Sequence, residues 1–270
     1  MEFLQTLLRI LDTSMETPTL YGWYHLLWLG LTALGTYLLC RFRPNVKKTL
    51  LCSALVVIFL EIYKQINYTF SYEGGITADY QWYIFPFQFC STPMYMCLLA
   101  GLVKPGKVSD SLKAYLATFS LFAGLCVMFY PGDVFISTVG INIQTMICHG
   151  SMVVIGIYLM HSGEVELKHR TITKAVPVFS ICVALAAMMN EIAYRTGLLE
   201  TETFNMFFIS PHCDPHLPVY SWVQGVVPFP WCLVLYIFGF SAAAYIILLL
   251  GMGTKALLRS KINEKLKIES

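Results

Sequence analysis

Seven long apolar stretches dominate the sequence and limit the folds open to it. A helix needs about 20 mostly apolar residues to cross the hydrocarbon core of a bilayer. We therefore predict an all-α polytopic membrane protein with seven transmembrane helices, at about residues 22–40, 50–70, 87–103, 112–130, 143–161, 174–195 and 229–250. The third stretch is short and follows Pro86, a residue type that is common where a helix begins.

Composition supports this class and argues against several others. Charged residues make up 13% of the chain and hydrophobic residues 57%, whereas soluble domains average about 25% charged residues. The formal net charge is +2, and no basic block is long enough to bind nucleic acid. We therefore expect neither a soluble enzyme nor a nucleic-acid partner.

The basic residues predict the orientation of the helices. Fifteen of the 18 Lys and Arg residues lie in alternate connections and in the tail, at residues 41–48, 104–113, 168–174 and 255–267. Cytoplasmic loops of membrane proteins carry the excess of Lys and Arg. The pattern predicts an N-terminus outside and a C-terminus in the cytoplasm.

The membrane domain, predicted at residues 18–253, has a distinct segment on each side. Residues 1–17 have apolar positions at helical spacing and predict an interfacial amphipathic helix. Residues 254–270 predict a basic cytoplasmic tail. The longest outer connection, 196–228, holds four prolines and several aromatic residues. We expect it to fold back as a cap over the outer mouth, because long structureless loops are uncommon.

The nine cysteines do not form a disulfide or metal-binding pattern. Eight lie in or at the ends of the predicted spans, where Cys behaves as a small buried hydrophobe. The segment Pro211–His216 brings two His, one Cys and one Asp together, so a metal site is conceivable there. A loop with incidental polar residues is the simpler interpretation, and we expect no metal and no cofactor.

Polar residues at membrane depth are costly and are therefore candidates for function. With the predicted orientation, those of four spans fall in the outer half, which predicts a water-accessible cavity open to the outside. They include Glu61, Lys64, Gln88, Cys90, His149, Asn190 and Glu191, with Asn67, Ser91, Asn142, Gln144, Tyr194 and Asn205 as further cavity residues.

These residues also have purely structural interpretations. Glu61 and Lys64 are three residues apart and can form an ion pair within one helix. Asn and Gln often only bond a neighbouring membrane helix, and Cys90 can be a core thiol. Cys148 and His149 point about 100° apart on a helix, so at most one of them faces the layer of Glu61.

Several local patterns together resemble the YwaF-like family of integral membrane proteins. The resemblance covers about residues 20–250 and rests on the order and spacing of five patterns. They are Glu61-Ile-Tyr-Lys64, Pro86-Phe-Gln88-Phe-Cys90-Ser91, His149, Asn205-Met-Phe-Phe-Ile-Ser-Pro211 and Val227-Pro228-Phe-Pro230-Trp231.

That family is similar to an animal transmembrane acyltransferase that uses a cysteine to move a polyunsaturated acyl chain onto ether phospholipids. The resemblance implies that Cys90 is the acyl-accepting nucleophile and that His149, 59 residues later, is its base. Glu61 or Glu191 would orient the imidazole, as the third member of a triad does. A membrane phospholipid is then the expected partner, without an obligate protein partner, and the cell membrane is the expected location.

Three alternatives remain open from the sequence. A lipid hydrolase results if water replaces the acceptor. A small-molecule transporter or a substrate-binding membrane protein without catalysis would also have seven helices and a polar cavity. A structural or regulatory protein could use the buried polar layer only to fix the register of its helices.

Overall fold

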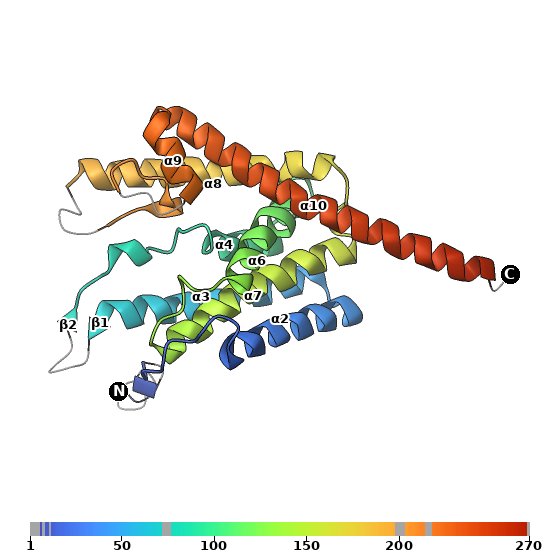
Figure 1. Cartoon of the computed structure of the whole chain (residues 1–270), viewed down its shortest axis with the longest axis horizontal. Coiled ribbons are helices and arrows are strands. Elements are labelled where there is room, and N and C mark those ends of the chain that lie inside the picture. Colours follow the sequence, from blue (N-terminus) through green and yellow to red (C-terminus); the bar gives the residue numbers. More distant parts are fainter. Residues whose placement is uncertain are drawn as a thin grey trace.

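The fold is described from a computed structural model of the chain (Figure 1). The structure describes residue 6 and residues 9–10, 12–71, 77–197, 203–213 and 218–268. For residues 218–219, 258–259 and 261–268 the description covers only the main chain. Of the predicted amphipathic helix at 1–17, residues 1–5, 7–8 and 11 lie outside the described residues, and residues 12–17 are not helical.

Six helices in the described part of the chain are long and apolar enough to cross a membrane. Lys107–Phe129 is one continuous unit made of α5 (Lys107–Tyr115), the π-helical turn η2 (Leu116–Ser120) and α6 (Leu121–Phe129). The others are α2 (Trp23–Phe42), α3 (Val46–Thr69), α7 (Val139–Ser162), α8 (Arg170–Arg195) and α10 (Phe229–Ile268). An all-α, multi-pass membrane protein is thereby confirmed.

The predicted third span, 87–103, is not a membrane-length helix. Helix α4 covers only Thr92–Leu102, about 16 Å at 1.5 Å per residue, against a hydrocarbon core of about 30 Å. Pro93 explains the late start, because inside a longer helix its ring would clash with the carbonyl of Phe89. Pro93 instead occupies the first turn of α4, where proline is tolerated, and the preceding residues are irregular.

Short elements connect the long helices. A two-stranded antiparallel hairpin, β1 (Phe70–Ser71) and β2 (Thr77–Ala78), extends α3 with Phe70 opposite Ala78. The single turn η1 (Trp82–Ile84) follows the hairpin. The turn η3 (Met206–Phe208) and helix α9 (Pro218–Val226) lie between α8 and α10.

Basic connections meet at one end of the bundle, which we call the basic end. The Tyr158 hydroxyl near the end of α7 donates to the Pro44 carbonyl at the start of α3. Lys113 pairs with Glu164 at 2.6 Å, and Lys174 pairs with Asp110 at 3.2 Å. The β1–β2 hairpin and α9 lie toward the opposite end (Figure 1).

Helix α7 is the central element and the most buried of the six membrane-length helices in the described part of the chain. Glycines allow the α5–α6 unit to approach it closely. A Cβ atom on Gly124 would lie 2.8 Å from Cβ of Met152, and one on Gly156 would lie 2.7 Å from Cβ of Leu121. Both distances are shorter than any normal contact, so this packing requires glycine.

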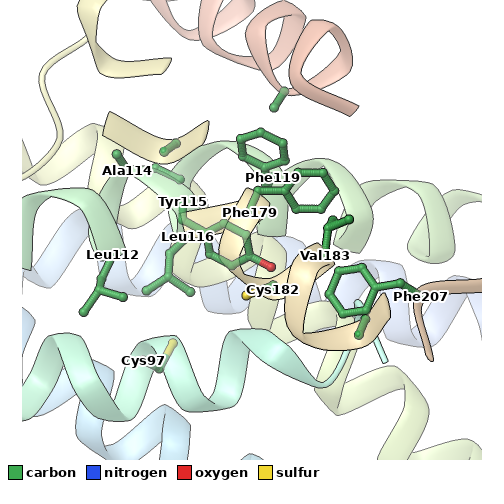
Figure 2. Packing of buried hydrophobic residues seen from close by; sticks show 14 of the residues in the cluster. Cys97, Leu112, Ala114, Tyr115, Leu116, Phe119, Phe179, Cys182, Val183 and Phe207 are labelled. Carbon is green, nitrogen blue, oxygen red and sulfur yellow. The ribbon is translucent and has the colours of Figure 1, made fainter. Parts of the chain in front are cut away.

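An aromatic cluster joins the segment before α4 with η2, α8 and η3 (Figure 2). The rings of Phe119 and Phe179 stack with centroids 4.5 Å apart, and those of Phe89 and Phe207 stack at 5.6 Å. Phe89 belongs to the irregular segment before α4, and Phe207 to the connection after α8. Two non-helical segments therefore share one core.

The segments predicted on either side of the membrane domain differ in what the structure describes. Residues 12–15 pair with the connection between α6 and α7, where the Met15 amide donates to Ser137 O at 2.8 Å. At the other end α10 continues as helix through Ile268, so the predicted tail prolongs the last helix.

Candidate active site

Cys90 lies in the irregular segment Phe85–Ser91 and precedes α4 by two residues. Side chains and turns provide hydrogen bonds for the main-chain groups of this segment. The Gln88 carbonyl accepts from the amides of Ser91 and Thr92 at 2.9 and 3.1 Å. The Thr92 hydroxyl donates to the Phe89 carbonyl at 2.9 Å. Non-helical main chain at membrane depth is tolerated only where protein buries it or where it lines a water-filled cavity.

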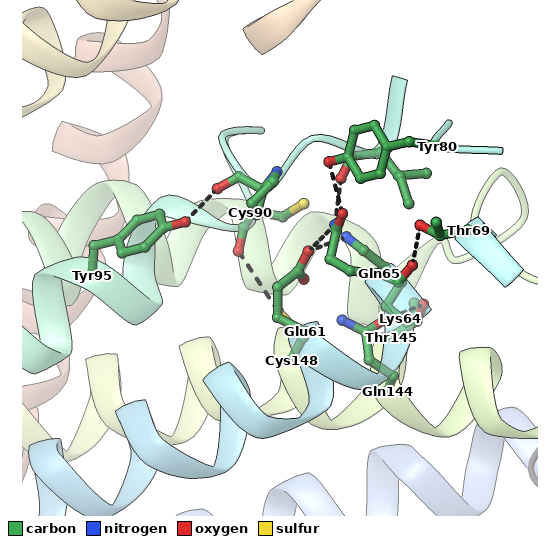
Figure 3. Close-up of polar contacts among 12 residues, drawn as sticks. Glu61, Lys64, Gln65, Thr69, Tyr80, Cys90, Tyr95, Gln144, Thr145 and Cys148 are labelled. Carbon is green, nitrogen blue, oxygen red and sulfur yellow. Dashed lines mark hydrogen bonds and ion pairs between the residues drawn. The ribbon is translucent and has the colours of Figure 1, made fainter. Parts of the chain in front are cut away.

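A network of four side chains, the Glu61 cluster, lies beside Cys90 (Figure 3). Glu61 is 5% exposed; its Oε1 atom lies 2.8 Å from Lys64 Nζ and accepts from Gln65 Nε2 at 2.8 Å. Gln65 Oε1 accepts from the Tyr80 hydroxyl at 2.8 Å. The ion pair considered from the sequence therefore exists, as part of a larger network.

Tyr80 is a hydrogen-bond donor in this network. Burial and the nearby negative charge of Glu61 both raise the pKa of Tyr80 above its ordinary value, so the phenol keeps its proton at neutral pH. Gln65 also donates to the carbonyl of Ile84 at 2.9 Å. The network thereby ties α3 to the segment that leads to Cys90.

Helix α7 contributes Cys148 and His149 next to this segment. The Cys148 thiol donates to the Cys90 carbonyl at 3.7 Å. Since neighbouring residues on a helix point about 100° apart, His149 faces a different direction from Cys148. Lys64 lies close enough to act electrostatically on both Cys90 and His149.

The hydrogen bond of His149 defines its tautomer. Its Nδ1 atom lies 2.8 Å from the Thr145 carbonyl, and because a carbonyl only accepts, Nδ1 carries the proton. Nε2 then holds a free lone pair. The partner that orients the buried imidazole is thus Thr145 rather than either carboxylate expected from the sequence.

A narrow cavity adjoins the Cys90 side chain. Its volume is about 10 Å³, enough for about one water molecule. Three cysteines and three serines contribute to its wall, namely Cys90, Cys97, Cys148, Ser53, Ser120 and Ser151. Among the described residues the Ser120 hydroxyl, which is buried, has no hydrogen-bond partner.

Gln88 and Asn190 hold the connection that follows α8. Gln88 donates to Asn205 O at 3.1 Å and accepts from the Phe207 amide at 3.0 Å. Asn190 donates to Met206 O at 3.0 Å and accepts from the Met206 amide at 2.8 Å. Phe207 has a φ of 58°, a strained conformation for a bulky residue, so these bonds stabilise an unfavourable main chain.

The remaining candidate residues differ in their surroundings. Ser91, next to Cys90, and Gln144, on α7, are both buried. Asn205 accepts from the Ser210 amide at 2.9 Å. The other contacts are Asn67 to Asp12 at 2.9 Å, Asn142 to Ile136 O at 2.6 Å, and Glu191 to Arg195 at 2.5 Å and His212 at 2.9 Å.

Tyr194 stacks on His212 with ring centroids 3.4 Å apart and is 60% exposed.

Together these contacts show that the residues of the predicted polar layer are distributed over several clusters. Glu61, Lys64 and Ser91 surround Cys90, whereas Gln88, Asn190 and Asn205 fix a loop.

Gln65, Tyr80 and Ser120 belong to the site but were not expected from the sequence. Gln65 follows Glu61 by four residues and so shares its helix face, which is a signal that spacing alone could have provided. Tyr80 lies in a connection whose course no periodicity predicts. Ser120 resembles any other small residue of an apolar helix.

No group of three or more His, Cys, Asp or Glu side chains within the described ranges could hold a metal ion. His212 and Cys213 belong to the segment considered as a metal site. His212 instead bonds Glu191, and Cys213 donates to Phe204 O at 3.7 Å. Asp214 and His216 lie outside the described residues.

The match to a protein family covers most of the chain. The family model described as TMEM164 family matches residues 20–251. The chain belongs to the TMEM164 family. The matched range runs from the residues before α2 into α10 and includes both Cys90 and His149, whereas the YwaF-like name receives no support. No curated protein and no solved structure matches the chain.

The loop contacts in this TMEM164 family member lead to a test of stability. Replacing Asn190 with Leu leaves the Met206 amide without its partner and leaves the Met206 carbonyl only the Ile209 amide, at 3.5 Å. Each buried group left without a partner costs about 1–3 kcal/mol. We expect N190L to lower the unfolding temperature in detergent and to speed hydrogen exchange at residues 204–210. The exposed Thr196→Ala change near the same helix end is the control, and equal exchange in the two variants would contradict the assigned role.

Proposed function

We propose that this protein is a membrane lipid acyltransferase in which Cys90 accepts the acyl group and His149 is the base. Animal members of the TMEM164 family are membrane acyltransferases. The observation that carries the proposal is the position of Cys90. Its thiol lies on an irregular segment between the charged Glu61 cluster and an apolar cavity. A lipid ester, which joins a polar headgroup to an apolar chain, matches that change of polarity.

Two features near Cys90 stabilise a thiolate, whereas its burial and the charge of Glu61 disfavour one. The thiolate, rather than the thiol, is the nucleophile of cysteine enzymes. Cys90 precedes α4 by two residues, so it lies near the positive end of that helix dipole, which stabilises a negative charge. The ammonium group of Lys64 acts on the same sulfur.

His149 has the protonation state that a base requires. Its Nδ1–H is held by Thr145, so Nε2 is free to accept a proton. The imidazole is 5% exposed, and burial favours its neutral form. No described hydrogen bond joins it to Cys90; catalytic contacts are often loose before substrate binds and tighten in the complex.

The reaction follows two balanced steps. The Cys90 proton passes to His149, and the sulfur attacks the ester carbonyl of the donor phospholipid. A C–S bond forms, the ester C–O bond breaks, and the leaving lipid oxygen takes the proton from His149. The acceptor hydroxyl then gives its proton to His149 and attacks the thioester. A new C–O bond forms, the C–S bond breaks, and the thiolate regains a proton.

Ser120 is the candidate donor to the carbonyl oxygen during both attacks. Its hydroxyl is buried, has no partner among the described residues and contributes to the same cavity wall as Cys90. Hydrogen-bond donors aimed at a developing oxyanion commonly contribute about 10²–10³ in rate. If water replaces the acceptor hydroxyl, the same residues hydrolyse the lipid.

We also propose that the chain crosses the membrane seven times, with its N-terminus outside. The contacts of Pro44 with α7 and of Lys113 with Glu164 support this, because they put the starts of α3 and α5 at the same, basic end. The chain from Phe70 to Lys107 must then traverse the bundle, and it does so as an irregular segment followed by α4. Basic connections on one side favour the cytoplasm for that side.

Thiol labelling in intact cells tests this topology. Thr77→Cys lies on the hairpin and Lys107→Cys on the basic end, and both positions are exposed. A membrane-impermeant maleimide should label T77C in intact cells above the background of the parent. It should label K107C only after permeabilisation. Labelling of both from the same side would contradict seven crossings.

Acyl exchange between labelled phospholipids in proteoliposomes tests the chemistry. We expect Cys90→Ala and Cys90→Ser to abolish exchange, since neither can form the thioester. His149→Ala should lower the rate by about 10²–10⁴, the usual contribution of a general base. Ser120→Ala should lower it by about 10².

Cys97→Ser provides the matched control, because Cys97 contributes to the wall of the same cavity but has no role in the proposed steps. It should retain most of the activity. Exchange at the parent rate in both C90A and H149A would refute the Cys–His mechanism. Release of free fatty acid without exchange would assign the site to a hydrolase.

A further inference from the structure

An apolar groove runs between α2, α3 and α7. Its volume is about 590 Å³, which lies in the range of about 300–1,000 Å³ that is usual for small-molecule sites. Trp28 and Leu31 of α2, Cys52 and Val56 of α3, and Ile147 and Val154 of α7 contribute to its walls. We call it the α2–α3–α7 groove.

This groove adjoins the cavity of Cys90. Ser53 and Val57 of α3 and Ser151 and Ile155 of α7 line both spaces. These four residues form the partition between the groove and the thiol. An acyl chain whose carbonyl lies at Cys90 would therefore enter the groove by passing between these four side chains.

The distribution of charge distinguishes the two ends of the groove. Among its described lining residues Lys48 is the only charged one, and it lies at the basic end. The other side of Cys90 is polar, because Glu61 and Lys64 lie there. Between Lys48 and Val57 the groove follows nine residues of α3, about 14 Å at 1.5 Å per residue.

The groove also borders the lipid. Cys52 and Val56 are exposed, and Val56 has 51% of its surface accessible. In a helix that spans a membrane, such apolar exposed side chains face hydrocarbon. A chain can therefore enter sideways from the bilayer without passing through water.

We infer that the α2–α3–α7 groove binds the acyl chain of a phospholipid while its ester carbonyl is presented to Cys90. This inference rests on the proposed function. It adds that the site recognises the acyl chain of the phospholipid. The headgroup then lies toward Glu61 and Lys64. The methyl end of the chain points along the groove toward the basic end.

Photo-crosslinking tests the groove without turnover. The probe is a phosphatidylcholine with a diazirine near the methyl end of one palmitoyl chain, reconstituted with the Cys90→Ala protein. We expect crosslinks in peptides of α2, α3 and α7 that line the groove. Val56→Trp should reduce them about tenfold, since small changes of pocket volume alter binding by this order.

Leu55→Trp is the matched control. Leu55 precedes Val56, is 61% exposed and does not line the groove, so crosslinking should stay at the level of C90A. Crosslinks confined to other helices, or equal losses in V56W and L55W, would overturn the inference.

The chain-length profile of acyl exchange is the second measurement, made on protein that retains Cys90. Val56→Trp and Ser53→Phe should slow palmitoyl exchange about tenfold more than octanoyl exchange, whereas L55W should keep the profile of the parent. Normal exchange with an unchanged profile in V56W and S53F would overturn the groove and leave the proposed function intact. Crosslinks in the groove without any exchange by the parent would refute the proposed function and support the lipid site.

Discussion

Main-chain groups inside a bilayer must find their hydrogen bonds within the protein, and with the proposed seven crossings residues 85–91 are the non-helical segment that has to meet this requirement. Pro93 prevents α4 from beginning earlier, so the segment cannot satisfy itself as a helix. Gln88, Thr92 and Tyr95 supply bonds to or within it. Gln88 also binds the connection after α8, and the two irregular segments therefore stabilise each other.

The same irregular segment places Cys90 where two environments meet. On one side the Glu61 cluster supplies buried charges and donors. On the other, a small cavity leads toward the α2–α3–α7 groove. An unbroken helix in place of this segment would satisfy its own main chain, and the bond from the Tyr95 hydroxyl to the Pro86 carbonyl would not be needed.

The sequence predicts the long helices well because apolar length is a local property. The late start of α4 could also have been predicted from the sequence, since Pro93 is incompatible with the interior of a helix. That Cys148 and His149 cannot both face the layer of Glu61 stays a prediction from helical spacing. The roles of Gln88 and Asn190 were not predictable, because Gln88 bonds a residue 117 positions away and only the tertiary fold brings the two together. A polar side chain that fixes a loop has the same sequence signal as one that binds substrate.

The central claim is that Cys90 carries the acyl group, and peptide mass spectrometry tests it most directly. Purified protein is incubated with a donor phospholipid that has a labelled acyl chain, quenched in acid and digested. The account predicts a labelled acyl adduct on the peptide with Cys90 that hydroxylamine removes, as expected for a thioester. An adduct on Cys97 or Cys148 instead, or no adduct in protein that exchanges acyl groups, would contradict the account.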